Sequence, residues 1–437
     1  MGQGQRRGPK ALRFRALLDP LKAAVARIPD TRDPEQIKYS LHDCYLSGFG
    51  LFYLQDPSLL EFQRRFEEEL KRNNLRSVFG VQAIPGDTQF RDILDLHEYE
   101  PIREIYAEWF EPMRRAKLLE DFQVLDGRYL ITLDGSQYFS SEHLQCPHCL
   151  RKSRKGVERY SHQILQATLV HPQRSQVIPL APEFICNTDG ATKQDCEQNA
   201  AKRQIERIRA EHRQLSAIIV TDSLFATGPF LNPLKDKRLS FISVVKPGDH
   251  KSLFTDIAGL RRGGMLEHLE VPGRNGRRLI YEWVDQVPLN GKEESPEINF
   301  VEFWIIKDGK VSYHNSWATD IEITEQNVEE LVRCGRARWK IENEGFNTLK
   351  NHGYHLEHNF GHGKKHLSEL FFVLNLLAFF VHQIFELVDG WYQIARAGFS
   401  ARVEFWNAIR AAFRLFLFNN WDEVLARMNG PPQPAVS

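Results

Sequence analysis

Apolar residues along the first 120 positions recur with the 3.6-residue period of amphipathic helices. The pattern predicts helices over 11–28, 34–54, 58–71 and 88–96. No β-rich stretch accompanies these helices, so residues 1–125 are expected to form a helical N-terminal region. A DNA-end-binding domain and a plain scaffold are both compatible with this pattern.

The pattern changes at Arg128, where short apolar runs typical of strands begin. Two of these runs end in an acid, Asp134 and Asp222. A strongly charged helix is predicted between the third and fourth strands, and the order favours a mixed sheet covered by helices, an α/β fold whose first part spans 126–254. The predicted strands are 128–134, 161–170, 176–184, 216–220 and 241–245, and the predicted helix is 194–213.

Residues 255–320 are predicted to form a β-rich insertion, because four strand patterns alternate with glycine-containing turns. The strands are expected at 267–271, 278–284, 300–307 and 310–315. The second part of the α/β domain then spans 321–395 and includes an apolar helix over 366–388. Residues 396–437 are expected to form a helical C-terminal region and a disordered, proline-rich tail.

A helix is predicted from Asn327 to Gly353, and its apolar face contains one acid, Glu342. A carboxylate on a core-facing stripe carries a desolvation cost unless it is paired or binds a metal. Arg338 lies one turn earlier on the same side and can pair with it. We therefore expect Glu342 to be catalytic. The stripe comprises Val328, Val332, Gly335, Trp339, Glu342, Phe346 and Leu349.

Asp134, Asp222 and Glu342 together suggest a metal site, because two strand-end acids and a helix acid can converge on one place. Hard oxygen ligands suit two Mg²⁺ or Mn²⁺ ions. Two such ions about 3.5–4 Å apart can activate a water or a 3′-hydroxyl for phosphodiester transfer. The structural alternative is that the aspartates cap loops and that Glu342 only pairs with Arg338.

Three motifs carry a family resemblance: Asp134-Gly-Ser, Thr221-Asp222-Ser and Arg338-Trp-Lys-Ile-Glu342. They resemble those of the cut-and-paste DDE transposases of bacterial insertion sequences, over roughly residues 126–390. The resemblance implies an RNase H-like catalytic core with a β-rich insertion before the third acid. It also implies metal-dependent cleavage of double-stranded DNA at terminal inverted repeats, strand transfer into target DNA, and a homodimer in the synaptic complex.

The family signature around the third acid is Tyr-x-x-Arg-x-x-x-Glu-x-x-x-x-x-x-Lys, in which the Lys comes seven residues after the Glu. Arg338 and Glu342 match, Gly335 stands in place of the Tyr, and Lys350 comes one residue after the Lys position. In the family the Arg and Lys contact DNA phosphate, which implies that role for Arg338 and Lys350. The one-residue offset leaves Glu344 as the alternative acid.

Trp317, near the end of the insertion, is a further candidate within the resemblance. Some relatives use an insertion-domain aromatic to stack on a base flipped out of a hairpin end. A buried tryptophan of the β-rich insertion is the alternative explanation.

Cys146-Pro-His-Cys149 is a candidate structural zinc knuckle in the hairpin between the first two strands. Zinc needs four ligands, and the remaining ones are open among His143, His148, His162, Cys186 and Cys196. A second, histidine-rich stretch contains His352, His355, His358, His362 and His366. This stretch fits a DNA-contacting loop or a metal site.

The amino-acid composition excludes some classes of protein but does not identify the function. The 437 residues contain 57 Lys plus Arg and 57 Asp plus Glu, so net charge favours no partner. The six cysteines are too few for a disulfide scaffold, the first residues are not expected to act as a signal peptide, and polar residues interrupt the apolar stretch 370–388. A cytoplasmic, nucleoid-associated protein without a membrane span is expected. The alternatives in function are a catalytically inactive DNA-binding protein on the same fold and a zinc-dependent hydrolase.

Overall fold

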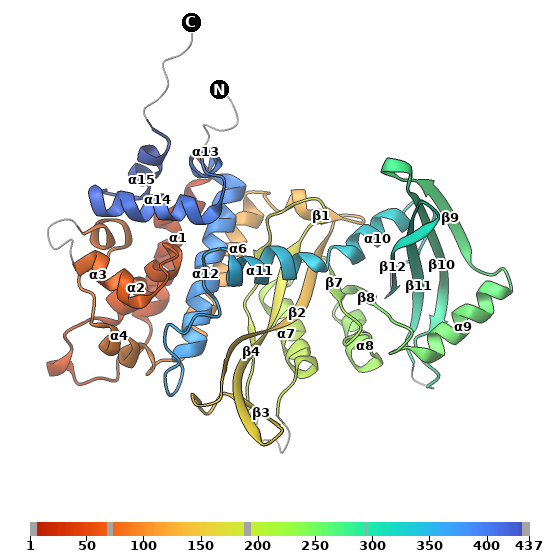
Figure 1. The fold of residues 1–437 in the computed structure, drawn as a ribbon, viewed down its shortest axis with the longest axis horizontal. Helices are drawn as coiled ribbons and strands as arrows, with labels where there is room; N and C mark the ends of the chain where they lie inside the picture. The colour runs from red at the N-terminus through yellow and green to blue at the C-terminus, as the bar shows by residue number, and fades with distance from the viewer. Residues whose placement is uncertain (1–6, 68–72, 188–193, 293–294, 431–437) are drawn as a thin grey trace, which may run out of the picture.

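The computed structural model describes residues 7–67, 73–187, 194–292 and 295–430 (Figure 1). Helices occupy one end of the molecule, a mixed sheet its centre and the β-rich insertion the other end. The long helix α12 (Leu367–Val388) stands between the helical end and the central strands. The predicted disordered tail, 431–437, lies outside the described residues.

Helices form both ends of the described chain, as the 3.6-residue periodicity predicts. The N-terminal helices are α1 (Phe14–Ala26), α2 (Leu41–Tyr53), α3 (Leu59–Glu67), the π-helix η4 (Leu75–Phe79), α4 (Asp87–Leu94), α5 (Glu100–Arg103) and α6 (Ile105–Arg115). The C-terminal helices after α12 are α13 (Gly390–Ala397), α14 (Arg402–Leu415) and α15 (Trp421–Met428). Short 3₁₀ turns are η2 (Lys10–Leu12), η3 (Pro34–Gln36), η5 (Glu120–Phe122) and η6 (Arg274–Gly276).

These two helical ends share one hydrophobic core around α12. The ring of Phe14 lies 5.3 Å from that of Trp421, and Tyr53 lies 5.4 Å from Trp406. The Tyr106 hydroxyl donates a hydrogen bond to the Val373 carbonyl of α12. Residues 7–115 therefore pack as part of the main body of the protein.

α12 is the one helix among the described residues that is long and apolar enough to cross a membrane, and 83% of its most apolar window is buried inside the protein. Its polar side chains have internal partners: Asn375 donates to the Tyr354 carbonyl, and His382 bonds to the Tyr354 hydroxyl. This confirms the prediction of a buried core helix.

The described strands form one twelve-stranded mixed sheet with helices packed against it, which confirms the predicted α/β class. The main path runs β3-β4-β2-β7-β8-β12-β11-β10-β9, and β5 and β6 pair with β4. β2 pairs antiparallel with β4 and parallel with β7, and β8 is parallel to β7. The central elements are β1 (Gln123–Val124), β2 (Arg128–Ser141), β3 (Leu150–Arg154), β4 (Val157–Val170), β5 (Ile178–Pro179), β6 (Glu183–Ile185), α7 (Glu197–Glu211), β7 (Ala217–Thr221), α8 (Gly228–Asp236) and β8 (Ser240–Val244).

β2 differs from the prediction, because it does not end at Asp134. The strand continues to Ser141, so Asp134 lies in its middle, opposite Gln166 of β4. The apolar run stops at the acid, but the backbone ladder continues because β4 is equally long and keeps pairing as far as Tyr160. The apolar pattern reports burial, and the exposed end of this hairpin is not buried.

The insertion strands continue the same sheet. They are β9 (Glu267–Pro272), β10 (Arg278–Pro288), β11 (Glu297–Lys307) and β12 (Lys310–Thr319), preceded by α9 (Lys251–Arg262). β12 runs four residues past its predicted end and pairs there with β8, Trp317 opposite Val244. The predicted turn between β11 and β12 has left-handed residues at Asp308 (φ 50°) and Gly309 (φ 72°), as a tight hairpin requires.

Candidate active site

The parallel pairing of β2 and β7 brings the two aspartates to the same level of the sheet. Thr132 of β2 is opposite Val220 of β7. Asp134 lies two positions after Thr132, and Asp222 lies two positions after Val220. Neighbouring strands lie about 4.8 Å apart, so both carboxylates project into one region. Asp222 follows the last residue of β7, and its Oδ1 accepts a hydrogen bond from the Leu224 amide at 3.0 Å.

Glu342 comes from a broken helix rather than the predicted continuous one. α10 (Val328–Arg336) ends in a turn at 337–338, and the π-helix η7 (Ile341–Phe346) and α11 (Asn347–Asn351) follow. The wider π turn changes which positions face the core. Trp339 is 44% exposed and Glu342 is exposed, whereas Ile341 is fully buried. The predicted core-facing position of Glu342 was therefore wrong, because the stripe assumes an unbroken 3.6-residue period.

Arg338 joins the carboxylates of the helix and the sheet. Its guanidinium donates to Asp134 Oδ2 at 3.4 Å and lies 2.8 Å from Glu342 Oε1. The charge of Glu344, the alternative acid, acts instead on Lys340. The structure therefore brings Glu342, and not Glu344, to Asp134.

The environment of Asp134 is that of a crowded carboxylate. Burial raises its pKa to about 7, Arg338 opposes this rise, and the charges of Glu342 and Asp222 add to it. The donors that meet here are carboxylate oxygens, the ligands that Mg²⁺ and Mn²⁺ prefer. The donor set at this position fits a hard divalent cation.

A fourth acid, Glu197, lies at the same site and was missed by the sequence analysis. It is the first residue of α7, and its carboxyl group packs on Gly135, where an added Cβ would lie 2.5 Å from the Glu197 Cδ. Burial and the charge of Asp222 raise the pKa of Glu197. The sequence signal was the glycine directly after Asp134, which leaves room for a second carboxyl group.

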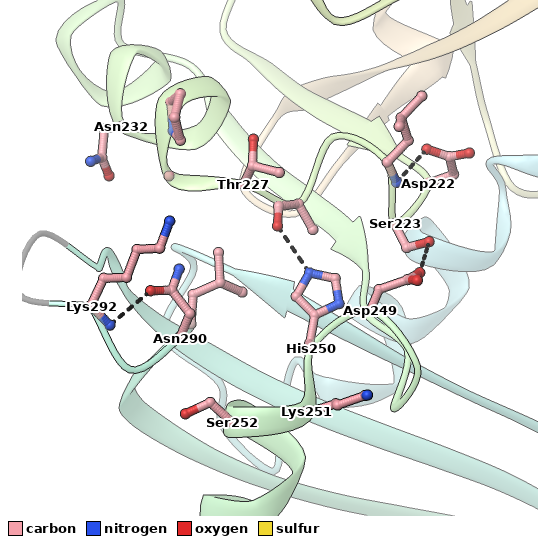
Figure 2. A pocket seen from close by; sticks show the side chains of 15 residues that line it. Asp222, Ser223, Thr227, Asn232, Asp249, His250, Lys251, Ser252, Asn290 and Lys292 are labelled. Atoms are coloured by element: carbon pink, nitrogen blue, oxygen red, sulfur yellow. Dashed lines mark hydrogen bonds between the residues drawn. The ribbon is translucent and has the colours of Figure 1, made fainter.

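A pocket of about 820 Å³ opens beside Asp222 (Figure 2). Its walls come from the loop after β7, the first turns of α8, the start of α9 and the turn between β10 and β11. The Ser223 hydroxyl donates to Asp249 at 2.8 Å, and the His250 ring bonds to the Ala226 carbonyl at 2.9 Å. Cationic groups line the insertion side of the pocket and the start of α9, namely Lys251 and Lys292.

The remaining candidates from the family signature are arranged differently from the prediction. Lys350 donates to the Gln137 carbonyl at 3.3 Å and pairs with Glu357 at 2.8 Å. Trp317 is fully buried, and an added Cβ on Gly335 would lie 2.7 Å from its indole nitrogen. Trp317 is therefore not positioned to stack on a flipped base, because β12 turns its side chain under α10.

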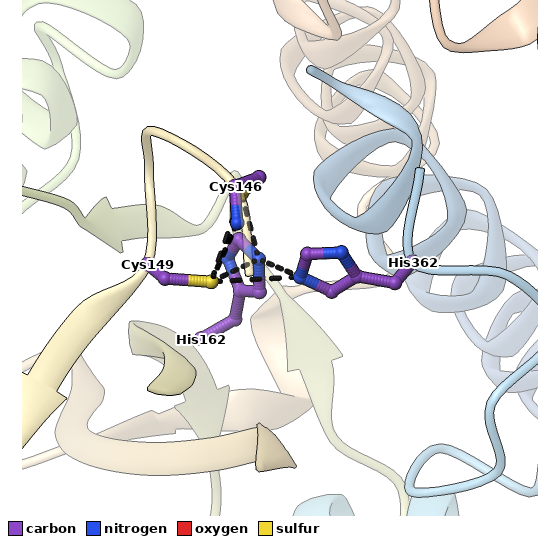
Figure 3. Close-up of side chains that lie close together, drawn as sticks. All are labelled: Cys146, Cys149, His162 and His362. Atoms are coloured by element: carbon purple, nitrogen blue, oxygen red, sulfur yellow. Dashed lines mark hydrogen bonds between the residues drawn. The ribbon is translucent and has the colours of Figure 1, made fainter. Parts of the chain in front are cut away.

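Four side chains from three segments form a buried cluster (Figure 3). Cys146 and Cys149 come from the hairpin between β2 and β3, His162 from β4 and His362 from the loop between α11 and α12. Of the candidate ligands considered from the sequence, only His162 joins the two cysteines. His362 was assigned to the separate histidine-rich stretch, and only the fold brings it here.

The other candidates of the zinc knuckle have different surroundings. His148 pairs with the buried carboxylate of Glu369 at 2.8 Å, and Cys186 donates to the same carboxylate. His143 and Cys196 are exposed. None of these four side chains contributes to the cluster of Cys146.

Comparison of the sequence with models of known protein families gives a match. Residues 183–380 match the family model described as the transposase DDE domain. The matched segment contains Asp222, Glu342 and the β-rich insertion and begins after Asp134. No curated protein matches the chain. The match confirms the predicted resemblance to DDE transposases over residues 183–380.

Proposed function

We propose that this protein is a DNA transposase of a bacterial insertion sequence that cleaves its element at the terminal inverted repeats and transfers the ends into target DNA. The observation that carries the proposal is the contact of one guanidinium, Arg338, with both Asp134 and Glu342. It links the acid of the first strand to the acid beyond the insertion. The strand order is β5/β6-β4-β2-β7-β8, in which β4 is antiparallel to its neighbours on both sides and β7 and β8 are parallel to β2. This arrangement supports an RNase H-like core.

The metal site of the proposed reaction consists of Asp134, Asp222 and Glu342, with Glu197 beside them. These residues would hold two Mg²⁺ or Mn²⁺ ions. When bound, such ions supply a nucleophilic oxygen and stabilise the leaving oxygen in phosphodiester cleavage and transfer. The surrounding protein groups hold the carboxylates in place: β2 and β7 hold the aspartates at one level, and η7 presents Glu342 to solvent, where DNA can reach it.

Arg338 has a second proposed role, at the DNA phosphate beside the cut. Its guanidinium lies among the carboxylates with 22% of the side chain exposed, and a bidentate cation is suited to a phosphate. Lys350 would contact phosphate only after leaving Glu357, which makes it the weaker of the two contacts. The pocket beside Asp222, with Lys251 and Lys292 on its wall, would offer the DNA backbone cationic groups next to that acid.

The partners follow from the reaction. Two element ends must be held together, so the active species is proposed to be a homodimer on double-stranded DNA in the cytoplasm, at the nucleoid. The division into 1–125, 126–254, 255–320, 321–395 and 396–437 remains a prediction, with DNA-end binding assigned to the first region. Residues 1–125 would move together with the catalytic domain, because their helices belong to the same hydrophobic core around α12.

The two alternative functions are less well supported. The Cys/His cluster has four buried donors and so leaves no open position for a substrate, which argues against a zinc-dependent hydrolase. The presence of every carboxylate of the site argues against an inactive DNA-binding protein.

A cleavage assay tests the proposal. The substrate is the DNA that flanks the protein's own gene, incubated with Mg²⁺ and the full-length protein. Asp134→Asn and Asp222→Asn are each expected to lower the rate of strand cleavage at least about a hundredfold, since loss of a metal ligand removes several kcal/mol of transition-state stabilisation.

The matched control is Asp126→Asn, an exposed aspartate before β2 whose replacement should leave cleavage unchanged. Gel-shift binding of the same DNA by each variant separates lost chemistry from lost binding. Cleavage that persists in both active-site variants at the wild-type rate would overturn the assignment of the acids.

A further inference from the structure

The four donor atoms of the Cys/His cluster have the spacing of a metal coordination shell. Sγ of Cys146 and Cys149 lie 3.7 Å apart, and Nε2 of His162 lies 3.4 and 3.5 Å from them. Nε2 of His362 lies 3.5 Å from Cys149 Sγ and 3.1 Å from the His162 nitrogen. A tetrahedron with bonds of ~2.3 Å to sulfur and ~2.05 Å to nitrogen has S···S, S···N and N···N edges of about 3.8, 3.6 and 3.3 Å.

We infer that Cys146, Cys149, His162 and His362 bind a structural zinc ion. Two thiolates and two imidazoles in tetrahedral arrangement are the donor set that zinc prefers. All four side chains are buried, so the ion would be closed off from solvent and substrate. The two free cysteines have their Sγ atoms 3.7 Å apart, which is far beyond a disulfide bond and matches two ligands of one ion.

The surroundings of the cluster support coordination. The Nδ1 of His362 bonds to the Gly363 carbonyl at 2.8 Å, which orients the ring and leaves Nε2 for the metal. Phe139 of β2 packs against the His362 ring at 4.4 Å and the His162 ring at 5.7 Å. These contacts hold both imidazoles with their Nε2 atoms directed at the sulfurs (Figure 3).

A neighbouring group of donors, His148, His366 and Glu369, lacks the four ligands of a closed structural zinc site. It has three donors instead of four. The Glu369 carboxylate is buried and already accepts from His148 and from Cys186. The ion pair between His148 and Glu369 connects the segment Cys146–Cys149 to α12. One zinc ion per chain is therefore expected.

The zinc would connect two segments that carry the acids of the proposed active site. Cys146 and Cys149 follow β2, the strand of Asp134, and His162 lies on its partner β4. His362 lies in the loop that follows α11, directly after the π-helix of Glu342. The ion would therefore join the hairpin that follows the strand of Asp134 to the loop that follows the helix of Glu342. This consequence rests on the proposed function, whereas zinc binding itself does not.

The experiment measures the metal content of the full-length protein purified without added metal. About one zinc per chain is expected, and Co²⁺ substitution should give the thiolate charge-transfer and tetrahedral ligand-field bands of a two-sulfur site. Cys149→Ser and His362→Ala should each lose the zinc. The ligand-preserving variant His362→Cys should retain it and strengthen the charge-transfer band.

Two control variants are matched to the ligands, one by its position in the sequence and the other by its residue type. His148→Ala, within the same knuckle, and Cys196→Ser, an exposed cysteine, should keep the full zinc content. His362→Cys also guards against a folding artefact, since it restores a ligand at the position that His362→Ala removes. Wild-type protein without stoichiometric zinc, or His362→Ala protein with it, would overturn the inference.

The outcome is separable from that of the proposed function. Removal of zinc by a chelator is expected to lower the melting temperature by several degrees. DNA cleavage should fall in parallel when Mg²⁺ is resupplied. A zinc-containing protein that cuts no DNA would contradict only the transposase proposal, and a zinc-free protein that cuts DNA only the zinc site.

Discussion

Arg338 and Asp134 are 204 positions apart in the sequence, and their side chains meet at 3.4 Å. The same guanidinium pairs with Glu342 one helical turn further on, at 2.8 Å. One cation therefore links the strand that precedes the insertion with the helix that follows it. The choice between Glu342 and Glu344 depends on this contact.

Glu342→Gln is expected to abolish Mg²⁺-dependent strand cleavage, with a loss of at least about a hundredfold in rate. Glu344→Gln, two residues away at a carboxylate whose charge acts on Lys340, should cleave at the wild-type rate. Single-turnover cleavage on the same DNA checks both variants. A larger loss of cleavage in the Glu344 variant than in the Glu342 variant would identify Glu344 as the third acid, as the one-residue offset of Lys350 allows.

Gly135 is expected to be needed because Glu197 packs on it. Gly135→Ala would push the Glu197 carboxyl group away, and Glu197→Gln would remove its charge. Both changes should lower cleavage about tenfold, corresponding to ~1.4 kcal/mol, and the double variant should lose little more than either single one.

The control for this pair is Gly259→Ala in α9, where an added Cβ meets nothing within 4 Å. It should leave cleavage unchanged. Unfolding midpoints measured alongside distinguish a positioning role from a structural one. Full activity of the Glu197 variant would show that the carboxylate only fills space beside Asp222.

Gly335→Ala is expected to destabilise the protein, because its Cβ would lie 2.7 Å from the Trp317 indole nitrogen. Overpacking of this kind costs about 1–3 kcal/mol. Gly345→Ala, in the π-helix of the same region, meets its nearest neighbour only at 4.0 Å and serves as control. Denaturant unfolding of both variants measures the difference.

The same contact predicts the result of restoring the family tyrosine. Gly335→Tyr would drive a larger group into Trp317 and should reduce the yield of folded protein instead of improving activity. A well-folded tyrosine variant with raised cleavage would mean that Trp317 can move aside.

His212, at the end of α7, is expected to make stability depend on pH. Burial lowers its pKa from 6.5 to about 4, with the ring packed 4.5 Å from Phe110. As the pH falls below 6.5 the unfolded chain takes up this proton, and the folded protein does not until about pH 4. Stability from the neutral ring is therefore complete above pH 6.5 and is lost as the pH falls toward 4. The loss amounts to about 3 kcal/mol at most.

The test compares wild type and His212→Gln by urea unfolding at pH 7.5 and pH 4.5. The difference in unfolding free energy between the two proteins should shrink or change sign at the lower pH. His143→Gln, at an exposed position, is the control and should keep a constant difference. An equally constant difference for His212→Gln would show that the buried ring does not resist protonation.

The sequence by itself determined the order of elements and indicated three acids as candidates for the site. Asp134 and Asp222 could be found because each follows an apolar run, and such runs report buried backbone locally. The insertion strands and the buried nature of 366–388 could be predicted for the same reason. Cys146 and Cys149 were identifiable as a pair because both ligands lie within one turn of chain.

The tertiary structure alone decided which distant side chains meet. Asp134 lies mid-strand because β4 supplies a partner beyond the apolar run, and Glu342 is exposed because the helix breaks into a π turn. Trp317 is buried because β12 pairs with β8, and the local sequence pattern of a strand does not predict which other strand it pairs with. His362 reaches the cysteines, and Glu197 reaches Gly135, through contacts between segments whose separation in sequence carries no periodic signal. Periodicity records which face of an element is buried, whereas these contacts depend on how complete elements pack together.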